Sequence, residues 1–123
     1  EKNVVEVARR DTKEKMTVSI DGLAETIHTL LNDIQQNIYS RAKIFRDENI
    51  SKADTWEEFV KLLDGPGGFV SAHWDGTAAT EDKIKDLSKA TIRCIPLNNL
   101  QEEGKCILTG NPSKERVLFA RAY

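Results

Sequence analysis

The stretch that decides the fold is residues 21–49, DGLAETIHTLLNDIQQNIYSRAKIFRDEN. Its apolar side chains recur at three- and four-residue steps, the spacing that places them on one face of an α-helix. They are Leu23, Ile27, Leu30, Leu31, Ile34, Ile38, Ala42 and Phe45. Asp21 can cap the free amides at the helix start. The pattern therefore predicts a single helix, roughly 40 Å long at the usual rise per residue, that ends at about Asn49.

Two short strand-like segments precede this helix. Residues 4–8 are rich in valine, and residues 16–20 alternate apolar side chains with hydroxyl side chains. Both features are typical of β-strands with one half-buried face. The polar stretch 9–14 separates the two segments, which are predicted to pair as a β-hairpin.

Shorter elements follow the helix. Thr55 and Glu58 have the spacing of a capping box, in which the two residues satisfy each other's free backbone amides, so a second helix is expected to start there. The glycine- and proline-rich run 65–68 must end it. Beyond this run, the sequence predicts a strand at 69–74, a short capped helix at 80–87, and strands at 90–97, 105–109 and 116–122. The expected fold class is α+β: a long helix followed by a small domain with short helices and a three- to four-stranded antiparallel sheet.

The composition is that of an ordinary globular domain of 123 residues, 39% of them hydrophobic and 31% charged. The formal net charge of -2 argues against an autonomous nucleic-acid binder, because such domains carry an excess of Lys and Arg.

No apolar run is long enough to cross a bilayer, so no membrane association is expected. The absence of a signal-peptide pattern and the small number of cysteines favour a cytoplasmic location. Because Glu1, and not Met, opens directly on a strand that needs neighbours, the chain is expected to be cut from a longer protein.

Few residues indicate chemistry of their own. His28 and His73 lie near no nucleophile motif, so surface or packing positions are favoured over catalysis. Cys94 and Cys106 could hold half of a tetrahedral zinc site, but no third or fourth ligand lies near them in sequence. Two reduced, half-buried thiols are therefore the favoured interpretation. Paired carboxylates such as Glu102-Glu103 are interpreted as solvated charge.

A basic cluster lies at the turn between the first two strands. Arg9, Arg10, Lys13 and Lys15 could bind phosphates or base edges there while the rest of the surface stays neutral to acidic. Because four charges are few and Asp11 and Glu14 partly cancel them, composition alone favours a solvated turn.

Four short stretches, taken together, resemble prolyl-tRNA synthetase of the archaeal/eukaryote-like type. They are Val7-Ala8-Arg9-Arg10-Asp11-Thr12, Thr91-Ile92-Arg93-Cys94-Ile95-Pro96, Glu102-Glu103-Gly104-Lys105-Cys106 and Arg116-Val117-Leu118-Phe119-Ala120-Arg121-Ala122-Tyr123. Their order and spacing match the family over essentially the whole chain.

The resemblance implies an enzyme that activates proline with ATP and Mg and transfers it to tRNA(Pro), acting as a homodimer with a class II catalytic domain. That domain would lie upstream of Glu1, so no catalytic residue and no cofactor is assigned to this chain. By resemblance, residues 1–22 are the terminal strands of the anticodon-binding domain and residues 23–50 a long connecting helix. Residues 51–123 are the C-terminal domain, which docks on the catalytic domain.

Site residues follow from the same resemblance. Arg9, Arg10 and Lys13 are the positions expected to approach the anticodon stem or loop. The terminal Tyr123 matches the aromatic residue that ends the family's chains, and it is expected to be a structural supporter and not a reactant.

Zinc is where this sequence departs from the family. Relatives often bind zinc in the C-terminal domain through four cysteines, and only Cys94 and Cys106 stand at matching places. Zinc is therefore expected to be lost, with these two positions vestigial and with Leu100 and Leu108 filling the space by apolar packing.

Two other functional classes remain open. One is a free-standing tRNA-binding or protein-interaction module without catalysis, against which the missing initiator Met counts. The other is a small redox or metal protein that uses Cys94 and Cys106, against which the missing ligands count.

Overall fold

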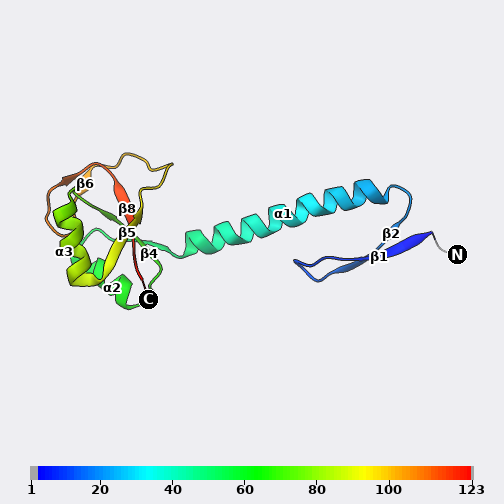
Figure 1. The fold of residues 1–123 in the computed structure, drawn as a ribbon, viewed down its shortest axis with the longest axis horizontal. Helices are drawn as coiled ribbons and strands as arrows, with labels where there is room; N and C mark the ends of the chain where they lie inside the picture. Colours follow the sequence, from blue (N-terminus) through cyan, green and yellow to red (C-terminus); the bar gives the residue numbers. More distant parts are fainter. Residues whose placement is uncertain (1–2, 123) are drawn as a thin grey trace. The chain divides into compact units, whose positions relative to one another are not determined.

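The computed structural model describes residues 3–122 of the chain. The chain divides into two compact units, the first ending at Arg46 and the second beginning at Asp47. Figure 1 follows the chain from its N-terminal strands through the long helix to the sheet and short helices that come last. No helix within residues 3–122 has both the length and the apolar character needed to cross a membrane.

The first unit contains a hairpin and the long helix. Strands β1 (Val4–Ala8) and β2 (Lys15–Ser19) pair antiparallel, with Val7 opposite Met16. Helix α1 runs over Leu23–Glu48, so the predicted hairpin and the predicted long helix are both confirmed. Alternate strand residues are half-buried, as expected of a two-stranded sheet with one covered face.

Helix α1 has no buried residue at all. Its half-buried positions form one stripe at helical spacing, which begins with apolar side chains and ends with polar ones: Leu23, Ile27, Leu30, Ile34, Asn37 and Ser40. Several of its other apolar side chains, among them Leu31, Ile38 and Tyr39, are more than half exposed. The predicted apolar face is therefore only partly covered by the described residues.

The second unit is built on a four-stranded sheet in the order β3-β4-β8-β5. The strands are β3 (Ile50–Lys52), β4 (Phe69–His73), β5 (Ala90–Cys94) and β8 (Arg116–Arg121). Strand β8 pairs antiparallel with β4 and with β5, whereas β3 pairs parallel with β4. The prediction of an all-antiparallel sheet is thus wrong at this edge. Three residues directly after a helix carry no periodic signal, and α2 supplies the crossover that parallel pairing requires.

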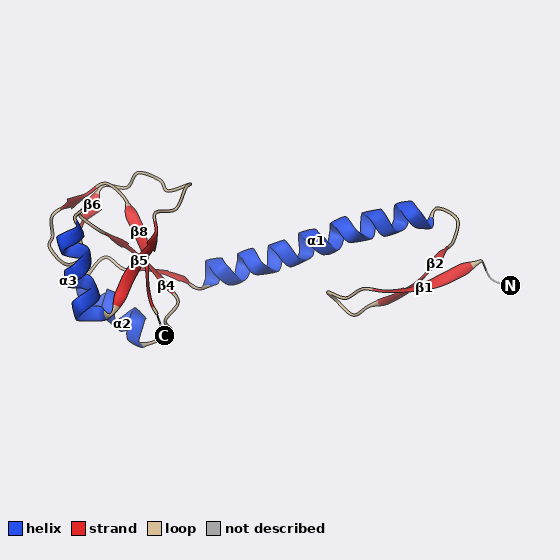
Figure 2. Cartoon of the chain, in the orientation of Figure 1, coloured by secondary structure: helices blue, strands red, loops and turns tan. Residues whose placement is uncertain are grey.

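Two short helices pack with the sheet, and Figure 2 shows them in blue beside its red strands. They are α2 (Trp56–Asp64) and α3 (Ala78–Ser88). Thr55 caps α2 as predicted, its Oγ accepting from the Glu58 amide at 3.2 Å. The other half of the predicted capping box differs, because the Glu58 carboxylate accepts from the Asp54 amide at 3.0 Å and not from that of Thr55. Helix α3 begins two residues earlier than predicted, because Thr77 is its cap.

The core of the second unit is built around two phenylalanines. Its largest fully buried side chains are Phe59, Val70, Ile84, Val117 and Phe119, contributed by both short helices and by β4 and β8. The rings of Phe59 and Phe119 meet edge to face, with centroids 5.2 Å apart. Such aromatic pairs add to the free energy of area burial.

One predicted strand is a turn in the structure. Strand β6 covers only Gly104–Lys105, where it pairs with β7 (Pro112–Ser113). Residues 106–110 turn, closed by a hydrogen bond of 2.9 Å from the Gly110 amide to the Cys106 carbonyl. The prediction of a strand at 105–109 is wrong because apolar residues in a short tight turn give the same local pattern as a strand.

Candidate functional site

The turn that joins β1 to β2 presents two free cations. The Arg9 amide donates to the Glu14 carbonyl at 2.8 Å and closes the turn. Arg10 and Lys13 within it are exposed, and neither makes an ion pair or a side-chain hydrogen bond with the described residues 3–122. Lys13 has φ +63°, in the left-handed region that favours glycine. The turn thus holds a lysine in an unfavourable backbone conformation and directs it to solvent.

Arg9 differs from its two basic neighbours. Its guanidinium donates to both carboxylate oxygens of Asp11, at 3.0 and 2.7 Å, and to Asp33 Oδ2 of α1 at 2.5 Å. Only 11% of its side chain is exposed. The hydrogen bond to Asp11, followed by the one to Asp33, raises the pKa of Arg9 further above its ordinary value. Of the three cations that the resemblance groups together, Arg9 is the one already neutralised by carboxylates.

Asp11 joins the turn to the helix. Its Oδ2 also accepts from the side-chain amide of Asn37 at 2.7 Å, and 1% of its side chain is exposed. The hydrogen bond from Arg9, followed by that from Asn37, lowers the pKa of Asp11 well below its usual range. Asp33 and Asn37 lie one helical turn apart on α1, so the two contacts fix the turn at two points.

Sequence reasoning did not find the helix side of this arrangement. Asp33 falls among the polar residues of α1, which predict a solvated face, and Asn37 has no local signal. An open polar groove between the turn and α1 is lined by Arg9, Thr12, Asp33, Gln36, Asn37 and Ser40. Its lining offers hydrogen-bond donors and acceptors to solvent.

A second polar centre lies in the other unit, around Asp75. Its Oδ2 accepts from Thr80 Oγ1 and Thr109 Oγ1, each at 2.9 Å, and from Asn111 Nδ2 at 3.3 Å. Its Oδ1 accepts from the Thr77 amide and hydroxyl. Burial by itself would raise the pKa of Asp75, but the hydrogen bonds, that from Thr80 foremost, outweigh it and lower the pKa to about 2. Asp75 therefore ties the start of α3 to the turn that follows β6.

The two cysteines do not form a metal site with their neighbours. Cys94 is exposed and Cys106 is buried, and both are free thiols, so the prediction that both are half-buried is wrong. Within residues 3–122, no group of three or more His, Cys, Asp or Glu is placed to hold a metal ion. Near the two cysteines, the Thr109 hydroxyl donates to Asp75, and the side-chain amide of Asn99 donates to Glu115 Oε2 and to the Arg116 carbonyl. The residues present do not fit zinc.

The apolar filling predicted for this region is half wrong. Leu108 packs against the core. Leu100, however, is 84% exposed, because neighbouring residues anchor the loop through polar contacts and leave its apolar side chains outside.

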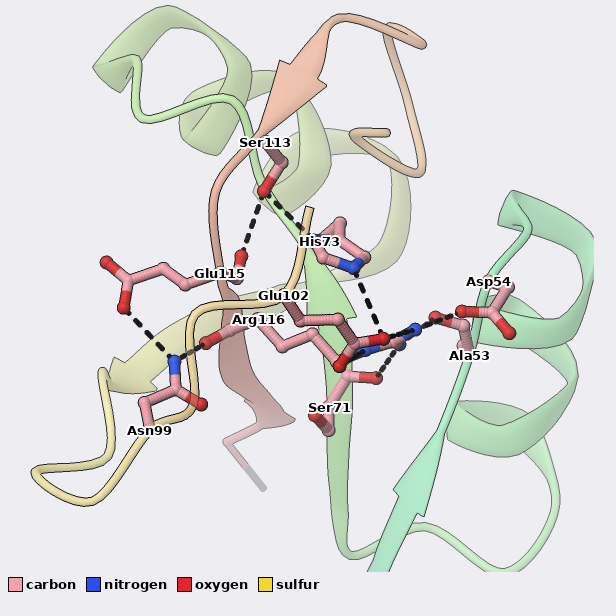
Figure 3. A network of polar contacts seen from close by, with 9 residues as sticks. All are labelled: Ala53, Asp54, Ser71, His73, Asn99, Glu102, Ser113, Glu115 and Arg116. Atoms are coloured by element: carbon pink, nitrogen blue, oxygen red, sulfur yellow. Dashed lines mark hydrogen bonds and ion pairs between the residues drawn. The ribbon is translucent and has the colours of Figure 1, made fainter. Parts of the chain in front are cut away.

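Figure 3 shows how a buried arginine holds this loop against the sheet. The Arg116 guanidinium donates to both Glu102 oxygens at 3.1 Å, to the Ala53 carbonyl at 3.1 Å, and to Asp54. Burial lowers the pKa of Arg116, but the hydrogen bonds to Glu102 and Asp54 outweigh this and raise it. Glu102 therefore pairs with Arg116 while 45% of its side chain stays exposed, so its interpretation as solvated charge is right only in part.

The two histidines differ in burial. His73 is buried, with Nδ1 at 3.0 Å from Ser113 Oγ and Nε2 at 3.8 Å from Glu102 Oε1. A side chain on Gly104 would collide with its ring, so the loop backbone packs directly on the imidazole. His28 is exposed on α1, where its Nδ1 lies 3.4 Å from the Asn32 amide. Tyr123 lies outside the described residues.

Comparison with known proteins decides the family. A family model described as "Prolyl-tRNA synthetase, C-terminal" matches residues 56–123. The chain belongs to this family. The resemblance to prolyl-tRNA synthetase seen in the sequence is thereby confirmed.

Relatives extend this similarity over the whole chain. Proline–tRNA ligases of Porphyromonas gingivalis and Cytophaga hutchinsonii are 55% and 57% identical to it over 123 residues, which is 100% of this chain and 25% of each relative. The chain thus spans about a quarter of the length of the curated relatives it matches. A crystal structure of prolyl-tRNA synthetase from Cryptosporidium parvum complexed with L-proline and AMP matches with a TM-score of 0.90 and 29% identity. That match covers 99% of this chain and 26% of the other.

Proposed function

We propose that this chain is the C-terminal part of a proline–tRNA ligase, a class II enzyme that attaches proline to tRNA(Pro) at the expense of ATP. The observation that carries the proposal is the 55% identity to proline–tRNA ligases over the full 123 residues. Residues outside this chain would perform the reaction and hold ATP and Mg. The enzyme would act in the cytoplasm as a homodimer.

The chain would serve the enzyme in two ways. Residues 1–22 would complete the anticodon-binding domain, and residues 23–50 would connect it to the C-terminal domain. Residues 51–123 would form that domain and dock on the catalytic domain, with Tyr123 as a structural supporter and not a reactant. Because no group of three or more His, Cys, Asp or Glu within residues 3–122 is placed to hold a metal ion, the domain would hold its shape without zinc.

Contact with tRNA is proposed at the turn between β1 and β2. Arg10 and Lys13 are exposed and have no partner within residues 3–122, so their charges are free to neutralise phosphates. Arg9, which is paired with Asp11 and Asp33, would take part through the geometry of the turn. With a net charge of -2, the chain by itself would bind tRNA weakly and lose that binding as salt rises.

The first test is aminoacylation by the complete polypeptide that carries this chain. Proline-dependent charging of tRNA(Pro) is expected from the complete polypeptide, and none is expected from residues 1–123 alone. An absence of charging by the complete polypeptide would contradict the proposal. Detection in native extract of a polypeptide no longer than this chain would instead favour a free-standing module.

The proposed tRNA contact has its own test. Lys13→Gly removes the charge while relieving the left-handed backbone, so the fold is expected to be at least as stable as before. In the complete enzyme, Lys13→Gly and Arg10→Ala should each raise KM for tRNA and leave kcat close to wild type. Each should also lower the slope of log KM against log salt concentration by about 1, the loss of one phosphate contact. Lys83→Ala, which removes an exposed charge from α3, is the matched control and should change neither. Unchanged KM in all three variants would remove this turn from the interface.

A further inference from the structure

We infer that Asp11 is a positioning residue, which locks the turn 9–14 onto α1 and so presents Arg10 and Lys13 to RNA as a fixed pair of cations. This inference rests on the proposed function and deepens it, since it names a residue that would act without touching the RNA.

The first observation is the burial of Asp11. It lies in a surface turn, yet only 1% of its side chain is exposed. Its carboxylate is surrounded by donors: two nitrogens of Arg9 and the amide of Asn37. Carboxylates in exposed turns are normally solvated, so this degree of burial indicates a specific tertiary contact.

The second observation is that the hairpin does not need this contact to close. The strands pair through their backbones from Val4 opposite Ser19 to Ala8 opposite Lys15, and the Arg9 amide completes the turn. The bonds of Asp11 to Asn37, and of Arg9 to Asp33, go instead to the helix. They set the direction of the turn relative to α1, and therefore where its exposed side chains point.

The third observation is the backbone of Lys13. A lysine in the left-handed region is strained where glycine would be free, and such strain persists only when the surroundings over-determine the conformation. The hydrogen bonds that Asp11, two residues earlier, accepts from Arg9 and Asn37 provide that constraint. A turn whose backbone is already fixed loses less conformational entropy when its cations bind phosphates, which is how a positioning residue would strengthen binding.

Charge supports the same division of roles. Asp11 and Asp33 would repel an approaching phosphate, and Arg9, which pairs with both, offsets one of their two negative charges. Among the described residues 3–122, the turn 9–14 also exposes two unpaired cations, Arg10 and Lys13, and the carboxylate of Glu14, which accepts from the Thr12 hydroxyl. Asp11 thus pairs with one cation, Arg9, and fixes the turn that carries the other two, Arg10 and Lys13.

The test measures tRNA charging by the complete enzyme with Asp11→Ala. KM for tRNA is expected to rise about tenfold, with kcat close to wild type and with a weaker salt dependence, because the two cations no longer engage phosphates together. Asp82→Ala, which removes an exposed carboxylate from α3, is the matched control and should leave all three unchanged. A merely structural role would lower the melting temperature without changing the salt dependence of KM.

A double-mutant cycle separates positioning from direct repulsion. If Asp11 acts through Lys13 and Arg10, then Asp11→Ala should add little to the loss already caused by Lys13→Gly combined with Arg10→Ala. Fully additive losses would overturn the inference. A lower KM in Asp11→Ala would also overturn it, since removing a repulsive carboxylate would then be the dominant effect.

Asn37→Ala protects the test against a variant that fails to fold. It removes one hydrogen bond and leaves every charge in place, so a smaller rise in KM in the same direction is expected. Wild-type KM in Asn37→Ala, if Asp11→Ala does not fold, would overturn the inference. Failure of the proposed function is distinguishable, because the wild-type enzyme would then not charge tRNA with proline at all.

Discussion

Each of the two units of the chain is stabilised internally by different interactions. All of the large, fully buried side chains among the described residues belong to the second unit, whereas α1 in the first unit buries none. The second unit closes its own apolar core around Phe59 and Phe119. The first depends on backbone pairing, a half-buried stripe and the ionic contacts of Arg9 and Asp11. Similar apolar residues should therefore contribute very different free energies in the two units.

The largest effect is expected in the core of the second unit. Phe119→Ala removes a fully buried ring and its contact with Phe59, and should lower the free energy of unfolding by about 3–5 kcal/mol. Denaturant unfolding of the chain, followed by tryptophan fluorescence of this unit, would measure it. Leu97→Ala is the control, because Leu97 is fully exposed and its loss should cost no more than about 0.5 kcal/mol. Equal losses in the two variants would contradict the described core.

A smaller effect is expected at Asp75, which holds the second unit by hydrogen bonds. Asp75→Ala leaves the hydroxyls of Thr80 and Thr109 without their acceptor and should cost about 1–3 kcal/mol. Because folding lowers the pKa of Asp75 from 3.8 to about 2, its carboxylate stabilises the fold above about pH 4. That contribution should disappear as the pH falls from about 4 to about 2.

The pH dependence has its own control. Asp75→Asn keeps the shape of the side chain but does not titrate, so the difference in melting temperature between wild type and this variant should shrink on acidification. A constant difference between pH 6 and pH 2 would show that Asp75 is not the titrating group.

The smallest effect is expected on α1. Ile38 is 53% exposed and Ile84 of α3 is fully buried, so the same substitution compares the two units directly. Ile38→Ala should change the stability of the chain by no more than about 0.5 kcal/mol, whereas Ile84→Ala should cost about 2–5 kcal/mol. A large loss from Ile38→Ala, read out by circular dichroism of the chain, would show that this face of α1 is covered.

Local patterns predicted the elements well, and long-range geometry explains the errors. The spacing of Leu23, Ile27 and Leu30 indicated α1, and Thr55 indicated the start of α2, because these signals lie within a few residues of each other. The parallel strand β3 was missed, since its partner Phe69–His73 lies beyond an intervening helix. Leu100 was assigned to the interior on its apolar character, yet the polar anchors of its loop leave it outside.

The candidate sites show the same limit. The cations Arg9, Arg10 and Lys13 could be grouped from sequence, but nothing in their spacing distinguished the paired one from the free ones. The partners that make the distinction, Asp33 and Asn37, lie more than 20 residues away. Asp75 had no signal beyond a turn, because its donors come from two separate segments.

The sequence by itself determined the family, the α+β class, the long helix and the hairpin, because these depend on motif order and on periodicities that a single segment carries. The tertiary structure alone decided which charges are neutralised. Ion pairs such as that of Arg9 with Asp33 and that of Arg116 with Glu102 join segments without periodic relation, and only folding brings their atoms within hydrogen-bond distance.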